Sequence, residues 1–151
     1  MTQPQENDPT KNSVGRWEHF PHQADIGVRG IGPTMAAAFE QAATAMTSVI
    51  CDVDDIEPRE AVNIDCAAPD DGLLLVEWLN ALVLEMAAGG LLFSRFAVRI
   101  DRDRLHATAW GEPVDVPRHA PAVEVKGATL TELSVSRNAS GEWIAQCVVD
   151  V

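Results

Sequence analysis

The chain has 151 residues, 46% of them hydrophobic, which is enough for one domain with its own core and excludes global disorder. Its 23 acidic and 11 basic residues give a formal net charge of −12. Because a nucleic-acid backbone is bound through Lys and Arg, we expect no direct nucleic-acid binding. No uninterrupted apolar run reaches the roughly 18 residues of a membrane span, and the polar N-terminus has no apolar signal segment. We therefore expect a cytoplasmic protein without membrane contact.

Residues 1–15 contain amides, prolines and scattered charges without hydrophobic periodicity. They are predicted to be a flexible N-terminal tail ahead of a single domain, residues 16–151. Two short strands with a bend at Pro21 are expected next. A helix is then predicted over residues 34–50, because Thr34 is typical of an N-cap and apolar side chains recur every three or four residues.

Residues 60–66 alternate and predict a strand. The following helix, residues 73–88, has Asp70 or Asp71 as its N-cap and Gly89-Gly90 as its C-cap. It is apolar on nearly all sides, so we expect it to be largely buried. Further strands are predicted at residues 92–101, 104–110, 122–130, 131–137 and 142–151. This order predicts an α+β fold, a mostly antiparallel sheet with two helices packed on one face.

Four motifs follow one another along the chain: "HQADIGVRG", "LLVEWLNALV", "GEPVD" with "RHAPAVEVKGATL", and "WIAQCVVDV" at the C-terminus. In this order they resemble the motifs of the archease family, over residues 17–151. Gln23, Gly127 and Leu130 depart from the family's pattern. The resemblance implies a strand-helix-strand-strand unit into which a second such unit is inserted.

The resemblance also implies a function. Archease proteins are not enzymes themselves. They are activators of the tRNA-splicing RNA ligase, which joins 3′-phosphate or 2′,3′-cyclic phosphate RNA ends to 5′-hydroxyl ends. They promote guanylylation and multiple turnover of that ligase through a transient protein contact. The implied partner of this chain is therefore an RNA ligase.

Family resemblance further implies a site for a divalent cation, most simply calcium, with magnesium or manganese as alternatives. The ligands carried over to this chain are Asp25, Asp150 and Val151. Lys126, together with Asp25 and Asp150, is carried over as a residue that activates the partner. None of these four positions departs from the family's pattern.

The residues themselves leave alternatives open. Asp25 also fits a local cap that accepts backbone N–H bonds, and Lys126 fits an outward, solvated side chain. By period two, Asp150 is expected on an inward face of the last strand together with Gln146 and Val148. Three carboxylates close together raise one another's pKa unless a cation joins them, and hard divalent ions favour oxygen ligands.

His22, His119 and Glu77 are candidates for residues that orient the metal ligands. A lone His is more often structural. Glu77 with Asn80 also fits a rim position where the helix meets water, or a position at which Asn80 bonds a loop backbone. No phosphate-binding G-x-x-x-x-G-K-[ST] loop is present in the sequence. Two other classes of function stay open: a small metal-dependent phosphoesterase that uses the same carboxylates, and a metal-independent chaperone or binding module.

The three cysteines, Cys51, Cys66 and Cys147, are widely spaced and odd in number. They lack the C-x-x-C spacing of a zinc site and the even number of a disulfide framework. Reduced, buried thiols are therefore predicted.

Overall fold

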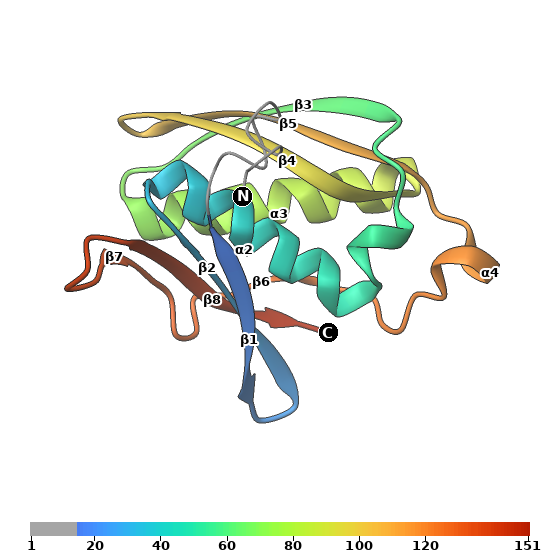
Figure 1. The fold of residues 1–151 in the computed structure, drawn as a ribbon, viewed down its shortest axis with the longest axis horizontal. Coiled ribbons are helices and arrows are strands. Elements are labelled where there is room, and N and C mark those ends of the chain that lie inside the picture. The colour runs from blue at the N-terminus through green and yellow to red at the C-terminus, as the bar shows by residue number, and fades with distance from the viewer. Residues whose placement is uncertain (1–14) are drawn as a thin grey trace, which may run out of the picture.

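The computed structural model describes residues 15–151, so the predicted tail lies outside the described residues except for Gly15. Figure 1 shows two antiparallel sheets with two helices between them. The helices are α2 (Met35–Ile50) and α3 (Asp71–Gly89). One sheet has the order β1 (Arg16–His22), β2 (Asp25–Gly32), β8 (Trp143–Asp150) and β6 (Gly127–Ala128), with β7 (Ser134–Arg137) also paired to β8. The other has the order β3 (Glu60–Ala67), β5 (Arg104–Pro113) and β4 (Leu91–Asp101).

The α+β class is confirmed, and each sheet has the two helices packed against one of its faces. Strands that were expected in one sheet form two, because alternation within a strand shows which face is buried but not which strand lies beside it. The strands β3, β4 and β5 with helix α3 form a strand-helix-strand-strand unit. This unit is inserted between α2 and β6, as the family resemblance implies. Two short helices, η2 (Val53–Asp55) and α4 (Val116–His119), lie in the connections at its two ends.

Small residues let α2 lie directly on β2. A Cβ atom on Gly30 would stand 2.0 Å from the carbonyl oxygen of Ala38 and 2.3 Å from the backbone nitrogen of Ala42. The helix begins at the predicted cap, where Thr34 Oγ1 accepts a hydrogen bond from the Ala37 N–H at 3.0 Å. Close backbone contact between helix and strand therefore explains the run of alanines in α2.

Helix α3 has the predicted ends. Asp70 accepts from the Leu73 N–H at 2.8 Å, and Gly90 takes the left-handed conformation with φ 62°. The prediction that α3 is largely buried is wrong, since one face is covered while Leu84 on another face is 65% exposed. By length and composition α3 also meets the criteria for a membrane span, which core helices meet as well. Its buried residues are Leu74, Leu75, Trp78, Leu79 and Leu82.

The first hairpin has no bend at Pro21. β1 continues through this residue. Proline has no N–H to donate, and an edge strand tolerates this because it pairs with a neighbouring strand on one side only. The chain turns instead at Gln23, whose φ is 55°. The Phe20 ring covers Gly27 on the paired strand, where a Cβ atom would stand 2.2 Å from the ring.

The inward face of β8 differs from the prediction. Ala145, Cys147 and Val149 are fully buried in the core, whereas the Gln146 side chain accepts a hydrogen bond from Arg29 on the outer face. Asp150 is exposed. The predicted set contains the polar residues Gln146 and Asp150, whereas the alternate set, Trp143, Ala145, Cys147 and Val149, is entirely apolar. The alternation therefore favours the set that meets the helices, and the prediction chose the other one.

All three cysteines are free. Cys51 and Cys147 are buried as predicted, and Cys66 is half-buried. Burial raises the pKa of the Cys147 thiol to about 12, so this thiol is an inert part of the core.

Candidate functional site

One terminus of each of three strands in the larger sheet lies at the same place. β2 begins at Asp25, β8 ends at Asp150, and β6 begins at Gly127. Ile26 pairs with Val149, and Gly127 pairs with Asp150, so the central strand β8 presents its last residues between the other two strands. We call Asp25, Lys126, Asp150 and Val151 the carboxylate corner.

Two hydrogen bonds join the parts of this corner. The Val151 N–H donates to Asp25 Oδ1 at 3.4 Å, and the Lys126 N–H donates to the Asp150 carbonyl at 2.8 Å. Asp25 therefore accepts a backbone N–H, as the capping alternative requires, but the donor lies 126 positions away in the sequence. Asp150 and Lys126 are exposed, while Asp25 and Val151 are half-buried. The structure thus brings together all four residues that the resemblance assigned.

The donors in the corner suit a hard cation. Asp25 and Asp150 supply carboxylate oxygens, and a chain that ends at Val151 supplies a third carboxylate there. Within residues 15–151, no group of three or more His, Cys, Asp or Glu side chains is placed to hold a metal ion. A cation at this corner therefore depends on the Val151 carboxylate and on oxygen ligands from outside the chain.

Lys126 lies just before β6 and not within a strand, contrary to the prediction of a strand over residues 122–130. Its neighbours fix it at both sides: Val125 is buried in the core, and the Ala128 N–H donates to Asn80 Oδ1 of α3 at 2.8 Å. Asn80 bonds a backbone N–H, as one alternative expected, but that N–H belongs to strand β6 and not to a loop. α3 therefore holds the segment that carries Lys126 beside the end of β8.

Of the three predicted orienting residues, one lies next to the corner. His22 faces Asp25 across the first hairpin and is half-buried. Glu77 is exposed on α3. The pKa of the Cys66 thiol on β3 is raised to about 11, mainly by burial of the thiol and next by the negative charge of Glu77. His119 has its hydrogen bonds with Asp115 and Glu112, in a separate network.

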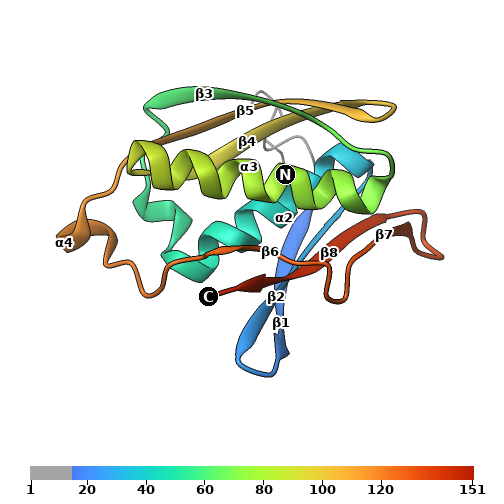
Figure 2. The ribbon, with the colours of Figure 1, turned by 180° about the vertical axis from the view of Figure 1, so that it is seen from behind.

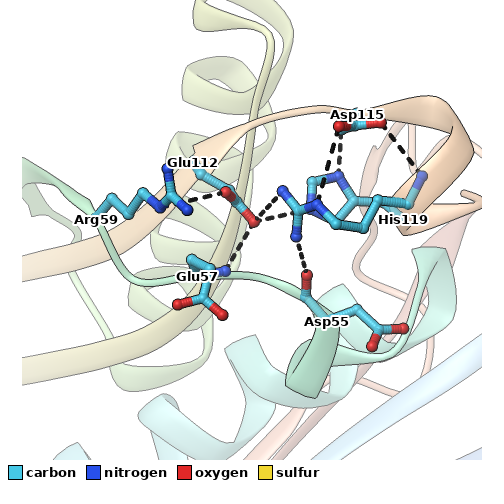
Figure 3. A network of polar contacts seen from close by, with 7 residues as sticks. Asp55, Glu57, Arg59, Glu112, Asp115 and His119 are labelled. Atoms are coloured by element: carbon cyan, nitrogen blue, oxygen red, sulfur yellow. Dashed lines mark hydrogen bonds and ion pairs between the residues drawn. The ribbon is translucent and has the colours of Figure 1, made fainter.

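That network surrounds a buried carboxylate which the sequence reasoning did not single out. Glu112, 3% exposed at the end of β5, accepts from the Glu57 N–H at 2.8 Å and has Arg118 Nη2 at 2.8 Å and His119 Nε2 at 3.0 Å (Figure 3). The Glu57 N–H contributes most to lowering the pKa of Glu112, followed by His119 and Arg118, and against the effect of burial they bring it to about 2. The fold therefore contains a buried carboxylate that is ionised at neutral pH.

The same network fixes the proton on His119. Its Nδ1 accepts a hydrogen bond from the Asp115 N–H at 2.8 Å, so the ring proton is on Nε2, which points at Glu112. Arg118 also donates to the Asp55 carbonyl at 2.8 Å. These contacts tie the connection after β5 to the segment around η2. In the sequence, the order Gly-Glu-Pro then Arg-His is the signal for this network, and of these residues only His119 is among the predicted candidates.

The model of the archease protein family (MTH1598/TM1083) matches residues 17–151. The chain belongs to the archease family. It is 39% identical over 140 residues to protein archease of Thermococcus gammatolerans, with 90% of this chain and 99% of the relative covered. Protein archease of Methanopyrus kandleri is 34% identical over 139 residues, with 89% and 99% covered. The solution structure of Methanobacterium thermoautotrophicum protein 1598 superimposes with a TM-score of 0.78 at 30% identity, covering 89% of this chain and 98% of that chain.

Membership in the archease family confirms the resemblance, and the structure shows where its motifs lie. The first motif forms the β1–β2 turn and β2, the second lies in α3, and the last forms β8. The Gly-Glu-Pro and Arg-His parts of the third motif form the Glu112 network, and its end forms β6. Parts of all four motifs therefore meet either at the carboxylate corner or in the elements that hold it.

Proposed function

We propose that this archease-family chain is a non-catalytic activator of the tRNA-splicing RNA ligase, and that it promotes guanylylation and multiple turnover of that enzyme. Family membership supports a role connected with tRNA processing. The net charge of −12 favours action through a protein partner over direct RNA binding. The observation that carries the proposal is the convergence of Asp25, Lys126 and Asp150-Val151 at one accessible corner.

In this proposal Asp25, Asp150 and the Val151 carboxylate hold a divalent cation, which is calcium because calcium tolerates irregular sets of oxygen ligands. When bound, the cation supplies positive charge to phosphate oxygens of the ligase's nucleotide. The chain's own residues do the rest. Asp25 fixes the position of Val151 by accepting its N–H. Lys126, exposed beside Asp150, presents an ammonium group to the partner or its phosphates.

The first test is multiple-turnover ligation by the partner ligase with and without this protein. Asp25→Ala and Asp150→Ala are each expected to reduce the stimulated rate about tenfold or more, because each removes one of very few ligands. Asp103→Ala is the matched control, since Asp103 is an exposed carboxylate in the β4–β5 turn. Full stimulation by either corner variant would refute the role of the corner.

The second test concerns Val151. Extending the chain beyond Val151 replaces its carboxylate with an amide, so a C-terminal tag is expected to abolish stimulation, whereas an N-terminal tag leaves it intact. The tagged proteins are compared by calcium titration in a calorimeter as well as by ligation. Equal activity of the two tagged proteins would exclude Val151 as a ligand.

The same assays separate the other classes of function. Hydrolysis of phosphate esters in the presence of magnesium, manganese or calcium, with no ligase present, would replace the proposal with a metal-dependent phosphoesterase. Intact stimulation without detectable calcium binding would replace the metal-bearing corner with a metal-independent binding module.

A further inference from the structure

An apolar groove lies next to the carboxylate corner. Its walls are the C-terminal half of α3, the start of β4 and the segment that leads into β6, and its volume is about 390 Å³. Figure 2 shows this segment, in orange, passing below α3 on its way from α4 to β6. At one end the groove is lined by Lys126, whose N–H is bonded to Asp150. The groove is therefore continuous with the corner.

The lining of the groove is mostly apolar. Apart from Gly90, Glu124 and Lys126, its side chains are apolar. Val114 and Val123, 42% and 39% exposed, form its rim. Exposed apolar side chains that gather around a concave surface are typical of a binding site, while scattered ones are not.

Two of the exposed large apolar side chains belong to the lining of the groove. Six large hydrophobic residues are exposed within residues 15–151, and Val114 and Val123 are the two that line the groove. The other four are Trp17 on β1, Leu84 on α3, Val116 in α4 and Leu130, which follows β6.

Charge indicates what kind of occupant fits. The chain carries a net charge of −12, and Glu124 stands at the groove beside Lys126. A partner that inserts an apolar side chain here approaches a strongly acidic molecule, so basic residues on either side of that side chain complement the net charge of the chain. A second copy of this chain would bring a further charge of −12 to the contact.

We propose that the groove is the docking surface for the RNA ligase and receives an apolar anchor from a ligase segment whose flanks are basic. This inference rests on the proposed function. Docking at the groove places the partner over Lys126 and Asp150, so one contact both binds the ligase and aligns the carboxylate corner with it. Val123 on the rim and Ala87 in the lining both contact the anchor in this proposal.

Two variants of the full chain test the groove. Val123→Glu puts a charge on its rim, and Ala87→Trp fills it from an exposed position on α3. Leu130→Glu is the matched control, because Leu130 is an exposed apolar residue outside the groove. Thermal unfolding of each variant establishes that it is folded. Binding to the purified ligase is measured by calorimetry at low and high salt, and ligation is measured over a range of activator concentrations.

Both groove variants are expected to raise the Kd for the ligase about tenfold and to raise the concentration for half-maximal stimulation by the same factor, while Leu130→Glu changes neither. Stimulation at saturating concentration should be recovered, because the carboxylate corner is intact. Ligase binding within twofold of wild type in both groove variants would overturn the inference, and so would a change that appears only as loss of self-association in sedimentation. A Kd that does not change with salt concentration would overturn the proposal that the flanks of the ligase segment are basic.

The inference and the proposed function fail differently. If wild-type protein binds the ligase and the groove variants do not, but no stimulation occurs, the groove stands and the activator role falls. If wild type stimulates and the groove variants stimulate at the same concentrations, the activator role stands and the groove falls.

Discussion

Replacing Asn80 with Ala tests whether α3 holds the segment that carries Lys126. Asn80 Oδ1 accepts the Ala128 N–H at 2.8 Å in a half-buried position, and the variant leaves this donor without its acceptor. An unsatisfied donor of this kind costs about 1–2 kcal/mol. For a chain of 151 residues, each kcal/mol lowers Tm by about 2–4 °C, so a decrease of about 2–8 °C is expected.

Two further substitutions serve as controls for this prediction. Asn80→Asp keeps an oxygen acceptor at the same place. Asn63→Ala removes an exposed side chain that accepts from the Thr108 hydroxyl at 3.2 Å, and should change stability by less than about 0.5 kcal/mol. Thermal unfolding is followed by circular dichroism, and exchange of the Ala128 and Lys126 amide hydrogens by NMR. Unchanged Tm together with wild-type exchange at Ala128 in Asn80→Ala would refute the reasoning.

Two other predictions concern packing and pH. Gly30→Ala should lower the free energy of urea unfolding by about 3 kcal/mol or more, because its Cβ would collide with the backbone of α2. In the control Gly90→Ala the Cβ meets open space, so this variant should lose only about 1–2 kcal/mol, for the positive φ of residue 90. Equal losses in the two variants would contradict this prediction. For Glu112, the folded-state pKa of about 2 lies below the ordinary value of 4.5, so its stabilising effect is complete above about pH 4.5 and is lost as the pH falls through 2. Glu112→Gln should therefore show a smaller fall in unfolding free energy over this pH range, and parallel profiles would exclude the effect.

Local features of this fold were predictable from the sequence because their causes are local. Thr34 begins α2 and Gly90 ends α3 through contacts within a few residues, and the apolar spacing of α2 marks the face that the core covers. The strands were likewise visible as alternating runs. What failed were two questions with a long-range answer: the division into two sheets and the depth to which α3 is buried.

The candidate site likewise depends on long-range contacts that local sequence patterns do not reveal. Asp25 and Val151 lie far apart in sequence, so no spacing rule joins them, and only the resemblance to the archease family placed them together. The Glu112 network depends on an N–H of residue 57 and side chains of residues 118 and 119, three segments whose approach is set by packing. A buried carboxylate within a polar motif gives no periodic signal, so it was not singled out.

The inserted unit gives a physical reason why the corner needs the whole domain. β2 and β8, which carry Asp25 and Asp150, belong to the outer unit, and their pairing alone places these two residues at adjacent strand ends. Lys126 is different, because β6 consists of two residues and has little pairing of its own. Asn80 from the inserted unit supplies the missing support. Loosening α3 should therefore disturb Lys126 before it disturbs the two carboxylates, so an inserted-unit variant that is still folded loses partner activation before it loses the cation proposed at the corner.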